Sequence, residues 1–300
     1  MKQAAMTVVM LAVTTFALAQ QPAPGQLNQP AAQPGTAQKG TAAPPPVGKR
    51  PPQAKTQAEF DAYKAAIASP SDPAAVEKSA DDFAAKFPTS ELRIVLYRAE
   101  MRGYQNANNG NKMSEAAQKL LKIDPDDPEA LVNVAEVIAE RTQDTDLDKD
   151  QRWDEAAKDA QHALETVASD VPAGLQPNQI ELYQGLIRST AYSILGSVSD
   201  HREKYADSEN YYRKSLDALP SQPDALVVLR LALALDKQGK YPDALKEASR
   251  AVDLTQENTS AGKVARQERD RLVQLTGGSN PAPGSSPPAG TAPNSTQPPH

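Results

Sequence analysis

Residues 191–220 read AYSILGSVSDHREKYADSENYYRKSLDALP, and residues 226–254 read LVVLRLALALDKQGKYPDALKEASRAVDL. Each segment contains two amphipathic stretches with apolar residues at helical spacing, separated by a short polar turn before Tyr205 or Tyr241. With an offset of 36 residues, the second stretches of the two segments stay in register. The matched positions are Ser208 with Ala244, Tyr212 with Ala248, and Ser215 with Ala251. The chain therefore contains an internal repeat of helix pairs.

This layout resembles the tetratricopeptide repeat, a helix-turn-helix unit of about 34 residues. Small residues at steps of three and four let neighbouring helices approach closely on one face, which agrees with the resemblance. The resemblance assigns Gly239 to the turn and Pro220 to the end of a unit. Ser208 and Ser215 depart from the family's usual alanines. The first-helix pattern falls on Tyr192, Leu195 and Gly196 in one unit, and on Val228, Leu231, Ala232 and Leu235 in the next.

Weaker units precede this pair. Asp127 and Pro128 predict a helix start, because aspartate caps helix N-termini and proline fits the first helical position. A thin apolar stripe of Val264, Leu272 and Leu275 predicts a closing helix that covers the last repeat. In total we expect about eleven helices, no strands and four to five stacked pairs. The resemblance implies an all-α fold, a right-handed superhelical α-solenoid.

The N-terminus has the features of a secretory signal peptide. Lys2 precedes an apolar run of thirteen residues from Thr7 to Ala19, which ends in small side chains. An uncleaved anchor is the alternative, but this run at about 1.5 Å per residue falls short of a hydrocarbon core of about 30 Å. We therefore predict residues 1–19 as a signal peptide of an exported bacterial protein. The mature chain would be periplasmic or secreted and would have no membrane span.

Proline divides the remaining chain. Of 26 prolines, nine precede residue 56 and seven follow residue 276. Residues 20–55 and 277–300 are rich in small and polar residues and cannot bury enough apolar surface to offset chain ordering. We predict both as disordered, and residues 56–276 as the helical repeat domain. This domain holds 27 basic and 38 acidic residues, a net charge of −11 that disfavours nucleic acid as a partner.

In tetratricopeptide proteins the first helices line a concave groove that holds an extended peptide or a partner helix. The resemblance places Asn133 and Glu136 in that groove from one unit. Ser193 and Ser197 follow from the next unit. The last unit adds Arg230, Leu233 and Lys237. The two-lysine, two-asparagine clamp of some chaperone-binding members is absent, so capture of a peptide C-terminus is not implied.

An acidic stretch, DTDLDKDQRWDE at residues 144–155, separates the two helices of the unit that starts at Pro128. Its carboxylates match the ligand positions of an EF-hand calcium loop, namely Asp144, Asp146, Asp148, Asp150 and Glu155. Lys149, however, stands where the sharp bend of such a loop requires glycine. The competing interpretation is a solvated acidic turn that precedes a helix whose first turn favours negative charge.

No motif for catalysis is present. The chain has no cysteine, and its three histidines, His162, His201 and His300, are far apart in sequence. His162 has Asp159 and Glu165 at helical neighbour spacing, which is typical of a solvated helix face. HExxH, phosphate-binding glycine loops and GxSxG are missing. We expect no enzyme activity and no cofactor, with calcium as the alternative.

The sequence thus predicts a non-catalytic scaffold of the bacterial periplasm or cell envelope that binds a protein or peptide. The alternative function is a module regulated by calcium through residues 144–155. The sequence does not indicate the partner or the oligomeric state. In either case the tails can act as flexible tethers that raise the local concentration of a partner.

The calcium alternative predicts a fluorescence response. Trp153, the single tryptophan, lies inside the acidic stretch, so bound calcium would alter its emission and raise the melting temperature at millimolar calcium. Titration of the purified chain, before and after chelation, measures both quantities. An unchanged spectrum together with an unchanged melting temperature would remove the alternative.

Overall fold

The computed structural model describes residues 49–68 and 72–277, and all regular secondary structure in these ranges is α-helical. The predicted signal peptide and almost all of the predicted tail lie outside the described residues, as does the predicted linker up to residue 48. The helices are α1 Gln57–Ile67, α2 Pro73–Lys86, α3 Arg93–Asn106, α4 Gly110–Leu121, α5 Pro128–Arg141, α6 Lys149–Thr166, α7 Pro177–His201, α8 Tyr205–Ala218, α9 Ala225–Lys237, α10 Tyr241–Leu254 and α11 Ser260–Leu275.

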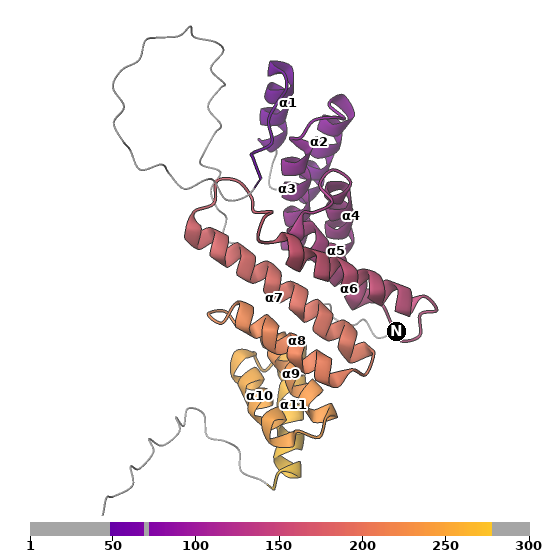
Figure 1. The fold of residues 1–300 in the computed structure, drawn as a ribbon, viewed down its shortest axis with the longest axis vertical. Coiled ribbons are helices and arrows are strands. Elements are labelled where there is room, and N and C mark those ends of the chain that lie inside the picture. The colour runs from indigo at the N-terminus through magenta and orange to yellow at the C-terminus, as the bar shows by residue number, and fades with distance from the viewer. Residues whose placement is uncertain (1–48, 69–71, 278–300) are drawn as a thin grey trace, which may run out of the picture.

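The helices form a row in which each one packs against the next in sequence (Figure 1). The first helices of successive pairs also meet: α5 contacts α7, α7 contacts α9, and α9 contacts α11. No comparable contact joins the second helices α4, α6, α8 and α10 to one another within the described ranges. The row therefore bends toward the first helices. We call the surface formed by α5, α7 and α9 the inner face. The predicted all-α solenoid of stacked helix pairs is confirmed.

Helix starts follow the capping chemistry read from the sequence. The Asp127 carboxylate accepts a hydrogen bond of 2.8 Å from the backbone N–H of Ala130, and Pro128 occupies the first turn of α5. Asp72 with Pro73 repeats this arrangement at α2. Such caps satisfy backbone N–H groups that have no partner inside the helix. The predicted start of α5 is confirmed.

Small buried residues allow the pairs to pack closely. The side chains of Ala156, Ala160 and Ala163 on α6 are fully buried against α5 and α7. Ser208 and Ser215 are equally buried on α8, where the family usually has alanine. Ser215 satisfies its hydroxyl by donating to the backbone carbonyl of Ser189 on α7 at 2.7 Å. Serine is therefore tolerated at this contact because a first-helix carbonyl lies within reach.

Three details differ from the sequence prediction. α7 has 25 residues and begins at Pro177, well before the quoted repeat at residue 191. α6 begins at Lys149, inside the acidic stretch 144–155 that was expected to separate the two helices. On α11, Leu272 is buried as expected, but Val264 and Leu275 are 43% and 52% exposed. The closing helix instead packs through small residues, because Gly262 comes directly against the backbone of the α10–α11 turn.

The N-terminal residues that the structure describes lie against the helices. The predicted linker runs to residue 55, yet the Arg50 guanidinium pairs with Glu91 at 2.6 Å and Lys55 Nζ donates to the carbonyl of Thr89. Lys49 reaches two loops further along the row. No helix in the described ranges combines the length and apolar character needed to cross a membrane.

Two helical glycines predict opposite responses to the same substitution. A Cβ at Gly196 on α7 would meet the Tyr212 ring at 2.6 Å, whereas a Cβ at Gly103 on α3 would have its nearest contact at 3.7 Å. We expect Gly196→Ala to lower the free energy of unfolding by about 1–3 kcal/mol through overpacking. Gly103→Ala should raise it by about 0.5–1 kcal/mol, because alanine favours helix. Urea denaturation followed by circular dichroism measures both. Equal effects of the two variants would contradict the close α7–α8 packing.

Candidate functional site

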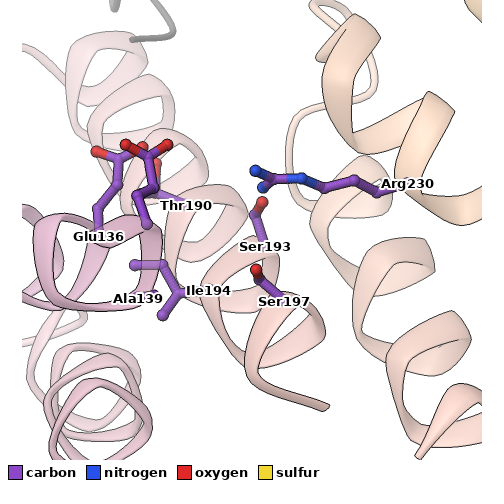
Figure 2. Close-up of a pocket in the computed structure, with 8 residues that line it drawn as sticks. Glu136, Ala139, Thr190, Ser193, Ile194, Ser197 and Arg230 are labelled. Carbon is purple, nitrogen blue, oxygen red and sulfur yellow. The ribbon is translucent and has the colours of Figure 1, made fainter. Parts of the chain in front are cut away.

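A small polar pocket lies on the inner face, between α5, α7 and α9 (Figure 2). It has a cavity volume of about 20 Å³, which is room for one water molecule. Three helices from successive repeats line it, so it exists only because the repeats stack. The lining residues are Glu136, Ala139 and Glu140 from α5, Thr190, Ser193, Ile194 and Ser197 from α7, and Arg230 from α9.

The charged groups of this pocket face one another without forming pairs. Glu136 and Glu140 are one helical turn apart on α5, and the Arg230 guanidinium points across from α9 (Figure 2). Within the described part of the chain, no hydrogen bond or ion pair involves Glu136, Glu140 or Arg230. Two carboxylates against one guanidinium leave the pocket with a net negative charge.

The surroundings make ionisation of this pair unfavourable. Burial in the concave surface raises the pKa of Glu136 to about 7, and the charge of Glu140 adds to the effect while Arg230 opposes it. Burial also raises the pKa of Glu140, against the attraction of Arg230 and Arg141. Glu136 is nevertheless partly exposed and Glu140 is exposed, so a group arriving from solvent can reach both. Arg230 and Arg141 act on these carboxylates only through space, so neither glutamate has a hydrogen-bonded counter-charge among the described residues.

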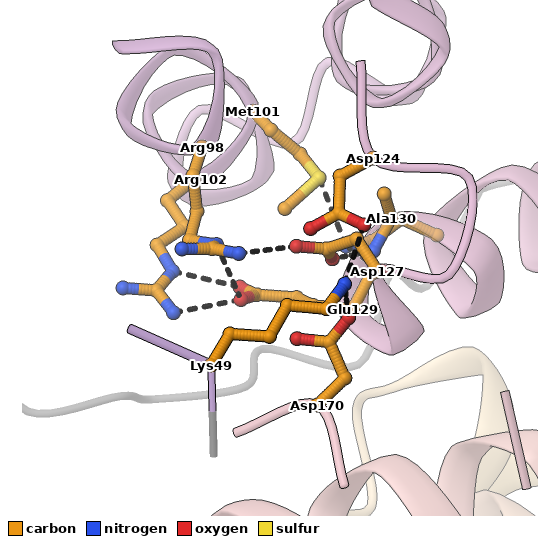
Figure 3. A network of polar contacts seen from close by, with 10 residues as sticks. Lys49, Arg98, Met101, Arg102, Asp124, Asp127, Glu129, Ala130 and Asp170 are labelled. Carbon is orange, nitrogen blue, oxygen red and sulfur yellow. Dashed lines mark hydrogen bonds and ion pairs between the residues drawn. The ribbon is translucent and has the colours of Figure 1, made fainter. Parts of the chain in front are cut away.

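The same helix carries a contrasting glutamate at its start. Glu129 receives two hydrogen bonds of 2.7 Å from the Arg102 guanidinium on α3 (Figure 3). Burial opposes the charge of Glu129, but Arg102 and Arg98 outweigh it and lower the pKa of this carboxyl. Arg98 also pairs with Asp127, the N-cap of α5. These arginines join the second and third repeats, which is a structural role.

Lys49 extends this network to the N-terminal segment. Its ammonium lies between Asp124 in the α4–α5 loop, at 2.6 Å, and Asp170 in the α6–α7 loop, at 2.5 Å (Figure 3). Burial works against the charge of Lys49, but hydrogen bonds to both aspartates raise the pKa of the ammonium. The segment before α1 is thus held against the side of the third repeat.

The structure brings together four of the seven predicted groove residues, Glu136, Ser193, Ser197 and Arg230. The other three lie elsewhere. Asn133 is 4% exposed and donates to the Glu129 carbonyl at 2.9 Å and to the Met101 sulfur at 3.4 Å, so it fills the contact between α3 and α5. Leu233 packs against the C-terminal core, and Lys237 is exposed near the end of α9. Asn133 is therefore an error of the groove prediction, because α5 contacts α3 as well as α7.

Two polar lining residues, Glu140 and Thr190, were not predicted from the sequence, nor were the apolar Ala139 and Ile194. Glu140 follows Glu136 by four residues, and Thr190 precedes Ser193 by three. Both spacings place side chains on the same helix face. Helical geometry applied to the four correct residues would have identified them.

The acidic stretch does not gather its carboxylates around one point. Asp144, Asp146 and Asp148 lie in the loop after α5, whereas Asp150 and Glu155 are on α6. The Asp146 carboxylate pairs with Arg152 at 3.3 Å. Across the described ranges, no group of three or more acidic or histidine side chains is placed to hold a metal ion. The calcium alternative remains a prediction that no contact supports.

Lysine and aromatic contacts close this loop instead. Lys149 Nζ donates to the Asp144 carbonyl at 2.9 Å and lies 5.5 Å from the centre of the Trp153 ring. The Trp153 ring is buried and stacks on His201 from the end of α7, with ring centroids 5.1 Å apart. The same lysine that breaks the EF-hand pattern thus begins α6 and covers its tryptophan.

The remaining histidine in the described ranges also makes a surface contact. His162 Nε2 lies 2.8 Å from Asp126, and 38% of its side chain is exposed. The inner-face pocket is far below the roughly 300–1,000 Å³ of ordinary small-molecule sites. The inner-face pocket is therefore too small to enclose a small-molecule ligand.

Solved structures with similar folds include PilW and Acl4. PilW, described as a widely conserved type IV pilus biogenesis factor, has a TM-score of 0.37 and 15% identity, and the match covers 70% of this chain and 99% of that chain. Acl4 (residues 1–338), described as an assembly chaperone of RpL4, has a TM-score of 0.35 and 12% identity over 73% of this chain and 98% of that chain. No family model and no curated protein matches. Similarity at this level shows neither a family nor a shared partner.

The two glutamates of α5 predict opposite effects of charge removal. The pKa of Glu136 in the folded protein is about 7, above its ordinary value of 4.5. Ionisation of this carboxyl opposes folding, so the free energy of unfolding falls as pH rises from 4.5 to about 7. Glu136→Gln should therefore leave stability near pH 4.5 unchanged. Near pH 8 the substitution should raise the free energy of unfolding by about 1 kcal/mol, a value discounted for solvent access. This corresponds to about 2–4 °C in melting temperature.

Glu129→Gln is the matched control on the same helix. It leaves Arg98 and Arg102 without a carboxylate between them and should lower stability near pH 8 by about 3 kcal/mol. Thermal melts of both variants across this pH range measure the difference. A lower melting temperature for Glu136→Gln near pH 8 would show that its charge is neutralised inside the protein.

Proposed function

We propose that this chain is a non-catalytic interaction scaffold that binds an extended segment of a partner protein along the inner face. The observation that carries the proposal is the pocket formed jointly by α5, α7 and α9, in which Glu136, Glu140 and Arg230 have no hydrogen-bond or ion-pair partner among the described residues. Solenoids commonly use the extended concave surface formed by stacked repeats for binding. A segment lying across these three helices would meet carboxylates, hydroxyls and a guanidinium in turn.

The distribution of ion pairs supports the inner face over other surfaces as the binding site. The arginines of α3 are paired with acids of α5, and Arg271 on α11 is paired with Asp236 on α9 at 2.6 Å. These contacts stabilise the repeats. Glu136, Glu140 and Arg230 contribute no such contact, although two of them are partly enclosed. Partly buried charges without partners reduce stability, and binding surfaces commonly accept that loss.

The proposed location is the periplasm or cell envelope of a bacterium. This part of the proposal rests on the signal-like residues 1–19, which lie outside the described structure. The proline-rich tails would tether the scaffold while leaving the inner face accessible. Calcium regulation is not part of the proposal, because the carboxylates of residues 144–155 are spread between a loop and a helix.

Site-specific crosslinking tests the scaffold. A photoreactive phenylalanine analogue replaces Ser193 at the pocket in one variant and Arg213, an exposed residue of α8, in the matched control. In cells that produce the protein, we expect a discrete crosslinked partner band at position 193 and none at position 213. The band should disappear when excess unmodified protein competes. Absence of the band, or equal bands at both positions, would contradict binding on the inner face.

A further inference from the structure

We propose that the pocket between α5, α7 and α9 receives one basic side chain, a lysine or an arginine, from the bound partner segment. Glu136 and Glu140 would accept its hydrogen bonds, and the α7 hydroxyls would line the remaining wall. The inference rests on the proposed function and specifies the chemistry of its partner.

The first argument is the missing counter-charge. Buried or partly buried glutamates elsewhere in the described ranges have partners: Glu59 accepts from the Ser90 hydroxyl and the Lys55 backbone N–H, and the others pair with a cation. Glu209 pairs with Lys240 at 2.7 Å, and Glu268 pairs with Arg271 at 2.9 Å. Glu136 and Glu140 have no such partner and stand one turn apart at a cavity. A buried or half-buried carboxylate pair gains most from a cation that supplies hydrogen-bond donors.

The second argument is that Arg230 does not fill this role. Its guanidinium projects from the far wall, and the pocket separates it from the α5 carboxylates (Figure 2). Arg230 also lies in the field of Asp200 on α7, and Asp224 at the start of α9 adds negative charge near Glu136. The field inside the pocket is therefore dominated by acids. A second cation is favoured there, and an anionic ligand is disfavoured.

The third argument disfavours a metal ion as the natural occupant. Among the described residues no group of three or more acidic or histidine side chains is placed to hold a metal ion, and this pocket has two carboxylates and, on α9, a competing guanidinium. A guanidinium carries five N–H donors and an ammonium three, and both need only acceptors around one side. The volume of about 20 Å³ admits one water-sized polar group, such as an ammonium or one edge of a guanidinium, and not a whole molecule.

The fourth argument concerns the approach of the partner. Residues 56–276 have a net charge of −11, so the body attracts basic segments over distances comparable to the Debye length. Long-range attraction alone would not fix how the partner segment is aligned along the inner face. The unpaired glutamates supply one position where a basic residue is preferred over all others.

Protonation adds a signature to this binding. The pKa of Glu136, raised by burial to about 7, means that its charge develops as pH rises through neutrality. Glu140, Arg141, Arg230 and Asp224 are the charged groups that act on this pair, and α7 contributes only uncharged residues to the pocket. Affinity for a basic residue should therefore be full above about pH 7 and decline below it.

Peptide selection tests the inference directly. Random phage-displayed peptides of about 12 residues are selected against the purified chain and, in parallel, against Glu136→Gln/Glu140→Gln. We expect one lysine or arginine position to be enriched for the native chain and not for the variant. For the best peptide, fluorescence anisotropy should give a dissociation constant about tenfold weaker with the variant, and a similar loss when the basic residue is replaced by norleucine.

The matched control is Glu155→Gln/Asp159→Asn, which removes an acidic pair of the same spacing from α6 of the same repeat. This variant should bind the peptide as the native chain does. The norleucine peptide and the pocket variant tested together should weaken binding no more than either change alone, because both changes remove the same contact. Circular dichroism and melting temperature verify that each variant is folded.

Two results would overturn the inference. One is a selection in which no enriched peptide depends on Glu136 and Glu140. The other is enrichment of acidic peptides whose binding is lost in Arg230→Gln, which would assign the pocket to an anionic group. In both cases a competed crosslink at position 193 would leave the scaffold function standing, so the two proposals fail separately.

Discussion

Close contact between neighbouring helix pairs is the constraint on which the structure depends. A single pair cannot cover its own apolar side, so every repeat is stabilised by the next one. The contact requires small residues where helices cross, such as Ala156, Ala160 and Ala163 on α6, and Gly196 has the same role inside the α7–α8 pair. Because the apolar surfaces are buried between repeats, the inner face can carry polar side chains. The candidate site occupies that free surface.

Periodicity in the sequence was enough to predict the fold class, the number of helices and the caps of α5. It was insufficient where a residue's surroundings depend on which helix packs against it. Val264 and Leu275 looked like an inward stripe, but α11 meets α10 through Gly262 and leaves both exposed. The early start of α7 had a readable signal in Pro177 and the capping box of Gln176 with Gln179.

The candidate site, too, could be predicted only in part from the sequence. Repeat position alone correctly placed Glu136, Ser193, Ser197 and Arg230 around one pocket, because stacked repeats present equivalent positions on one face. It could not distinguish Glu136 from Glu129, seven residues earlier on the same helix. Only the structure shows that Glu129 pairs with two arginines of α3 while Glu136 lines a pocket without forming an ion pair. The pairing state of a carboxylate depends on the neighbouring helix, which a single repeat does not encode.

The position of Lys49 between two loops determines the path of the chain before α1. Its ammonium fastens the chain between the α4–α5 and α6–α7 loops, although the first helix lies at the end of the row. Lys49, Arg50 and Lys55 together contact the α2–α3, α4–α5 and α6–α7 loops. Seven residues of chain thus bridge the three connections that join the first four helix pairs.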